Sequence, residues 1–148
     1  MSTPRDTDRD DRALAKVHTR VIDVIAGYEE LVERAEPELR PLATTMLDLH
    51  RRHEQTLGQM LREHGHASDD EGSFMSIVQE NVIRVRSWVD DLDAGVIPRI
   101  REGEQQLVEL YDDAIASAAG RAPEREALTA QRADLETLIA DMRAREPG

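Results

Sequence analysis

The chain has 148 residues, a formal net charge of −12 at pH 7 and no cysteine. Its length is typical of one domain with its own apolar core, and the lack of cysteine excludes disulfides, thiolate metal sites and a cysteine nucleophile. The acidity disfavours binding to nucleic acid or to an anionic membrane. Residues 1–12 do not have the character of a secretory signal and no apolar run is long enough to span a bilayer, so we expect a cytoplasmic protein.

The first half of the chain predicts two long helices. Residues 1–10 are polar and charged, and we expect a disordered tail there, ahead of a single helical-bundle domain over residues 11–145. Apolar residues recur every three or four positions from about 11 to 35, which is the period of a helix. A second helix should follow the turn at residues 36–37 and end near His64; the proline at position 41 predicts either a kink in this helix or a start nearer Arg40.

The second half predicts three more helices. An amphipathic helix over Ser73–Leu92 contains the only tryptophan, Trp88, and residues 93–95 should end it. A fourth helix is expected from near Pro98 to about Ala119. A last helix is expected from Pro123 to about Ala144, because proline favours the first helical turn.

The lengths of the connections predict the arrangement of these helices. Tight turns join the first helix to the second and the fourth to the last, so each pair should be antiparallel. The helix over residues 73–92 spans roughly 30 Å at about 1.5 Å per residue, which is enough to carry the chain back along a bundle. We therefore predict an all-α fold, a ferritin-like four-helix bundle whose long crossover carries an extra helix.

Three polar residues stand on or beside predicted apolar faces. His50 and His53 lie one turn apart on the second helix, a spacing at which two imidazoles can bind one metal ion. Glu104 lies on the fourth helix where the pattern calls for an aliphatic residue. A buried carboxylate must be paired, protonated or bound to metal. Counting along parallel helices places Glu104 within about two turns of His50, so these three residues are a candidate site for iron or zinc.

The same residues also have a structural interpretation. A di-iron carboxylate centre needs a Glu-x-x-His pair on each of two helices. Here the second helix has His50-x-x-His53, and the last helix has Glu136 without a histidine, so the full ligand set is absent. In this interpretation His53 is a hydrogen-bonded core residue and His50 is simply exposed. Glu104 would then bond Tyr28, His53 or an arginine across the bundle and fix the helix register.

No motif indicates catalysis. The sequence has no glycine-rich phosphate loop, no nucleophile elbow and no triad order, so we assign no catalytic residue and no cofactor other than the possible iron or zinc. The crossover helix suggests an interface instead. Val85, Trp88 and Val89 lie on its apolar face and should pack on the bundle or on another subunit.

Several short motifs occur in a recognisable order along the chain. They are Gly27-Tyr28, Glu36-Pro37-Glu38-Leu39, Gly72-Ser73 followed by Trp88, and Arg101-Glu102-Gly103-Glu104 followed by Tyr111. With these motifs the chain resembles bacterial four-helix-bundle proteins of unknown function that are placed among the ferritin-like domains. The resemblance implies a ferritin-like bundle without an established reaction. Such proteins often have a histidine near the position of Leu135, and its absence here argues against metal binding.

These observations give two functional expectations. The first is a bundle without demonstrable catalytic activity, an oligomerising structural, interaction or stress-associated module that forms a homo-oligomer. The alternative is a ferritin-like protein that binds iron or zinc at a degenerate site made by His50, His53 and Glu104.

Overall fold

The computed structural model describes residues 4–63, 81–88, 92–118 and 120–146. Within these ranges every regular element is helical, which confirms the all-α prediction. The elements are α1 (Pro4–Arg34), α2 (Arg40–Glu63), the short 3-10 helix η1 (Ala94–Val96), α4 (Ile97–Ser117) and α5 (Ala122–Arg145). Residues 81–87 form a further helical segment. None of the helices in these ranges combines the length and apolarity needed to cross a membrane.

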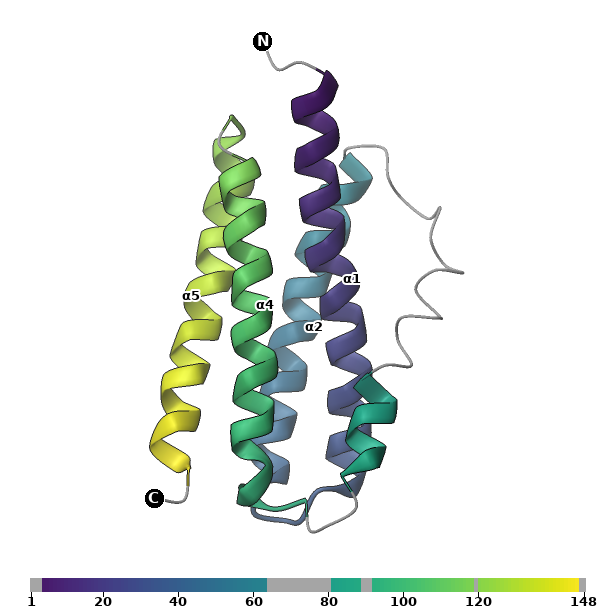
Figure 1. Ribbon diagram of the computed structural model, residues 1–148, viewed down its shortest axis with the longest axis vertical. Helices are drawn as coiled ribbons and strands as arrows, with labels where there is room; N and C mark the ends of the chain where they lie inside the picture. The colour runs from purple at the N-terminus through teal and green to yellow at the C-terminus, as the bar shows by residue number, and fades with distance from the viewer. Residues whose placement is uncertain (1–3, 64–80, 89–91, 119, 147–148) are drawn as a thin grey trace.

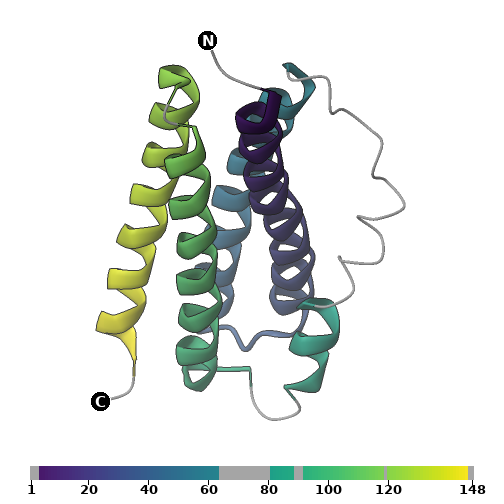
Figure 2. The same ribbon diagram turned by 45° about the horizontal axis from the view of Figure 1, so that its top comes forward.

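The four long helices lie side by side (Figure 1). α1 and α2 run in opposite directions, as do α4 and α5, whereas α2 and α4 run in the same direction; Figure 2 shows the same order from another angle. α1 packs against both α2 and α4, and α4 also packs against α5. Because α2 ends at the opposite end of the molecule from the start of α4, the connection between them joins the two ends.

The helix boundaries agree with the sequence patterns at most positions. α2 begins at Arg40, and α4 and α5 each have a proline in their first turn. α1 differs, because it begins at Pro4 and therefore extends into the residues predicted to form a disordered tail. Proline suits the first helical position, which agrees with a start at Pro4.

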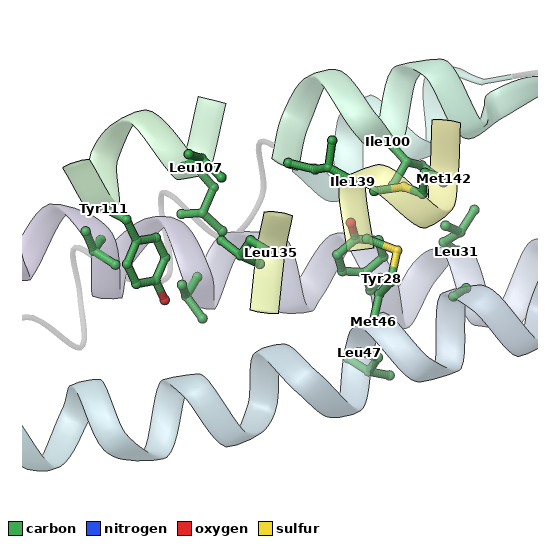
Figure 3. Close-up of a cluster of buried hydrophobic side chains, with 14 of the residues drawn as sticks. Tyr28, Leu31, Met46, Leu47, Ile100, Leu107, Tyr111, Leu135, Ile139 and Met142 are labelled. Carbon is green, nitrogen blue, oxygen red and sulfur yellow. The ribbon is translucent and has the colours of Figure 1, made fainter. Parts of the chain in front are cut away.

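The core is a continuous apolar cluster drawn from all four long helices. Figure 3 shows Tyr28 and Leu31 of α1 facing residues of the other helices. The largest side chains that are almost fully buried include Leu31, Leu39, Met46, Leu57, Leu107, Tyr111, Leu128, Leu135 and Met142. Burial of apolar surface on this scale is the main force that holds the helices together.

Residues 81–88 pack on α1 through a close backbone approach. A Cβ atom added at Gly27 would lie 2.9 Å from Cβ of Asn81, so only glycine fits at this contact. Asp23, which is fully buried, accepts a bond from the backbone amide of Asn81 at 3.2 Å and a second bond from its side-chain amide. Asn81 is therefore the residue that approaches α1 closely at Gly27.

The predicted interface residues divide between the described and the undescribed parts of the chain. Val85 is buried in the core, and Trp88 is partly buried against it. Arg34 holds this segment to α1 by donating to the carbonyl oxygens of Val85, at 2.8 Å, and of Trp88, at 3.3 Å. Val89 lies outside the described residues.

Candidate functional site

Polar side chains line the centre of the apolar core. We call them the central polar cluster: Tyr28 of α1, His50 and His53 of α2, Glu104 and Tyr111 of α4, and Gln131 of α5. All six are buried; Glu104 is 2% exposed, and His50 is 0% exposed, so the expectation that His50 faces solvent was wrong. Groups so deep in an apolar core are costly unless they bond one another, so their partners decide what the cluster can do.

Glu104 joins three helices at one oxygen atom. Its Oε1 accepts a hydrogen bond from the Tyr28 hydroxyl and another, at 2.7 Å, from Nε2 of His50. The rings of Tyr28 and His50 are also stacked, with centroids 5.5 Å apart and an interplanar angle of 13°. α1, α2 and α4 therefore meet at the Oε1 atom of a single carboxyl group.

The two tyrosines of the cluster are held as neutral phenols. Burial raises the pKa of Tyr28 well above its ordinary value, and the charge and hydrogen bond of Glu104 raise it further. Burial also raises the pKa of Tyr111, helped by the charges of Glu104 and Asp134. The Tyr111 hydroxyl donates to Oε1 of Gln131 at 2.6 Å. Each phenol thus acts as a donor that links two helices.

His53 lies beside the Glu104 junction but has a different partner. Its ring meets that of His50 edge to face, with centroids 6.0 Å apart. Its Nε2 bonds Oδ2 of Asp134 on α5 at 3.1 Å, and the Asp134 side chain is 54% exposed. Burial lowers the pKa of His53, and the bond to Asp134 opposes this change.

Histidine–carboxylate pairs connect α2 to each of the other long helices. His50 pairs with Glu104 of α4, and His53 pairs with Asp134 of α5. The third pair joins α2 to α1: His18 of α1 bonds Glu54 of α2 at 3.2 Å. A shift of α2 by one residue would move the α2 member of each pair by about 1.5 Å along the helix axis, so the three pairs favour one position of α2 relative to its neighbours.

The predicted metal ligands are brought together only in part. His50 contacts Glu104 directly, whereas His53 bonds Asp134. Three buried atoms of these residues have no hydrogen-bond partner: Oε2 of Glu104 and the Nδ1 atoms of His50 and His53. In the described ranges, no group of three or more His, Asp or Glu side chains is arranged to hold a metal ion. The assignment of iron or zinc to these residues stays a prediction.

The residues present do not fit a two-metal carboxylate centre. Such a centre uses free carboxylates and imidazoles from four helices. Here Oε1 of Glu104 already accepts two bonds from the chain's own donors, and the position facing the centre from α5 is occupied by Leu135, which is fully buried.

Sequence reasoning missed two acidic residues of the polar network. Asp134 precedes the buried Leu135 on α5, and its distance of three residues from Gln131 was a signal that it lies near the same face. Asp23 lies off the apolar stripe of α1, so the helical period gives no sign that it is buried. Residues 81–88 cover that side of α1, and no local sequence feature indicates this.

In the described residues, the structure is that of an all-helical protein with a polar cluster inside its core. The chain belongs to the family described as a domain of unknown function (DUF2383), which matches residues 11–117. This range includes Tyr28, His50, His53 and Glu104, whereas α5 lies beyond it. No curated protein and no solved structure matches the chain significantly. The resemblance to a family of unknown function is thereby confirmed.

Proposed function

We propose that the protein is a ferritin-like four-helix bundle without catalytic activity, which forms homo-oligomers and acts as a structural or interaction module in a stress-associated setting. The observation that carries this proposal is the Glu104 junction. Its Oε1 atom accepts bonds from Tyr28 of α1 and His50 of α2, so one carboxyl oxygen of α4 ties three helices together. A junction of this kind specifies helix register.

The helix order supports the ferritin-like part of the proposal. α2 and α4 run in the same direction, and a long connection links opposite ends of the molecule (Figure 1). An up-down pair followed by a crossover and a second antiparallel pair is the plan of ferritin-like bundles.

Residues 81–88 support the oligomeric part. Val85 faces the core, whereas Ile83 is 62% exposed. A second copy that packs on this segment would cover Ile83 and remove its apolar surface from water. Ile83 is the exposed large hydrophobic side chain among the described residues.

Sedimentation velocity over a range of concentrations tests the oligomer. We expect wild type to sediment as an oligomer, and Ile83→Glu to shift the distribution toward monomer, since a charge in an apolar contact is costly. The matched control is Thr129→Glu, which adds the same charge at an exposed position of α5. A wild-type protein that is monomeric at all concentrations would contradict the proposal.

The second candidate function is weak metal binding. It is favoured by the three buried, unpartnered atoms of Glu104, His50 and His53, which are chemically suited to zinc or iron. Calorimetric titration with zinc should show weak binding that disappears in the His50→Ala/His53→Ala double variant and persists in His18→Ala. If wild-type protein binds no zinc, metal binding is excluded as the function.

A further inference from the structure

Residues 81–88, which we call the strap, lie beside α1 (Figure 1) and bury little apolar surface. Among these residues Val85 alone is buried, whereas the others are exposed or half-exposed. The long helices differ, because α2 and α4 each bury several apolar side chains. Since apolar burial supplies most of the stability of a fold, we expect the strap to detach far more easily than a helix of the bundle.

Polar side chains of α1 hold the strap at both of its ends. Asp23 accepts bonds from the backbone amide of Asn81, at 3.2 Å, and from its side-chain amide. Arg34 donates to the carbonyl oxygens of Val85, at 2.8 Å, and of Trp88, at 3.3 Å. Water can replace the partner in each of these hydrogen bonds when the strap moves away, so each adds only a small net stability.

A cavity of about 50 Å³ lies beneath the strap. The strap forms one wall of this cavity, and α1 and α4 form the others, with Tyr28 and Glu104 among the lining residues. Gly103 of α4 also lines it, and a Cβ atom added to Gly103 would meet no atom within 4 Å. The empty space deprives part of the inner face of the strap of packing contacts, which weakens its attachment further.

Beyond this cavity lies a carboxyl group that is only half satisfied. Oε1 of Glu104 accepts bonds from Tyr28 and His50, whereas Oε2 is buried without a partner. A buried carboxylate oxygen that lacks a donor is costly, and the cost disappears when water reaches it. Removal of the strap, which forms one wall of the cavity, would therefore relieve an unfavourable state of Glu104.

We propose that the strap is a gate that undocks from α1 as one unit, while the four long helices stay folded, and admits water and small solutes to Glu104. The structure shows the closed state, in which Oε2 of Glu104 is sealed. Opening breaks the contacts of Asn81 and Arg34 together, because both join the strap to the same helix. The gate goes beyond the proposed function, since a junction that sets helix register needs no access to solvent.

Two measurements on the full-length protein test the gate. Labelling of carboxyl groups with a water-soluble carbodiimide, followed by mass spectrometry, measures access to Glu104. Amide hydrogen exchange measures the opening of the strap and of α2 around His50. We expect labelling of Glu104 and exchange of the strap to be insensitive to urea well below the unfolding midpoint, whereas exchange around His50 should accelerate as urea is added.

Substitutions at the two ends of the strap test whether both measurements report one opening. Arg34→Gln and Asn81→Ala should each raise strap exchange and Glu104 labelling by the same factor, roughly tenfold for one lost hydrogen bond. The matched control is Arg40→Gln. The Arg40 guanidinium also donates to a backbone carbonyl, that of Ala35 at 3.0 Å, so its substitution should change neither measurement.

The proposal is overturned if labelling of Glu104 has the same urea dependence as exchange around His50, because only global unfolding would then expose the carboxyl group. It is also overturned if Arg34→Gln and Asn81→Ala accelerate exchange of the strap without accelerating labelling of Glu104, or if they change neither measurement.

Discussion

Glu104 shows how one buried polar residue can organise several helices. Its neighbours on the inner face of α4, Ile100 and Leu107, are apolar, so solvent cannot satisfy its carboxyl group. The chain supplies the donors instead, one from α1 and one from α2. The contribution of the junction to stability can therefore be measured by removing one donor at a time.

Tyr28→Phe removes one donor and leaves the ring. We expect the free energy of unfolding to fall by about 1.5–3 kcal/mol, the range for a hydrogen bond to a charged group. Tyr111→Phe is the matched comparison, because its partner is the neutral amide of Gln131, and its expected loss is about 0.5–1.5 kcal/mol. Urea unfolding measures both. A Tyr28 variant that is no less stable than the Tyr111 variant would show that Glu104 does not depend on this bond.

The pKa values of both tyrosines are raised in the folded protein. The unfolded value is about 10. Above that pH the unfolded chain releases protons that the folded chain retains, so stability is fully present below about pH 10 and is lost as the pH rises further. Because the chain has only two tyrosines, absorbance of tyrosinate should show no ionisation until the protein unfolds. Titration of either tyrosine near pH 10 in the folded protein would contradict this.

The polar residues of the core were predictable to different extents. The anomalous position of Glu104 on an apolar face, with Tyr28 as a possible partner, could be read from the sequence, because the helical period fixes the face on which each residue lies. The partner of His53 could not, because Asp134 is half exposed and comes from a helix 81 residues further along the chain. The helical period shows which residues share a face of one helix. It does not show which face of the neighbouring helix those residues meet.

At the scale of the elements, two glycines have opposite roles. Gly27 of α1 is in close contact with Asn81, and Gly103 of α4 borders open space. Gly103→Ala should stabilise the protein by up to about 1 kcal/mol, which is the gain in helix propensity. Gly27→Ala should be destabilising despite the same gain, because its new methyl group would displace residues 81–88.

Thermal unfolding and the emission maximum of Trp88 check this pair of substitutions. The Gly27 variant should melt at a lower temperature with red-shifted emission, since the segment that carries Trp88 moves away from α1. The Gly103 variant should melt at a higher temperature. Equal effects of the two substitutions would show that the contact between Gly27 and Asn81 is not important.

Helix boundaries were well predicted where proline or a capping residue marks them, as at Arg40 and Pro98. The start of α1 was not, because residues 4–10 lack an apolar stripe and only Pro4 marks the beginning of the helix. The predicted crossover helix over 73–92 is described only at residues 81–88, where 81–87 are helical as expected. Its remaining residues lie outside the described ranges.

At the scale of the whole molecule, apolar burial and the polar junctions act together. The core extends through α1, α2, α4 and α5, and most of its buried hydrophobic residues are leucine, methionine or valine. Such burial is sufficient to hold a bundle of this length. The histidine–carboxylate pairs join α2 to α1, α4 and α5, and we expect them to favour one alignment of α2 over others that burial alone would allow.

The central claim is that the polar cluster joins helices and is not a di-iron centre. Calorimetric titration of metal-free protein with Fe(II) under nitrogen, followed by exposure to air, tests it most directly. Because Oε1 of Glu104 is bonded to Tyr28 and His50, and Leu135 stands where α5 faces the core, we predict that the metal-free protein is fully folded, binds iron weakly at most, and consumes no oxygen rapidly. Tight binding of two equivalents per chain followed by fast oxygen consumption would contradict the claim.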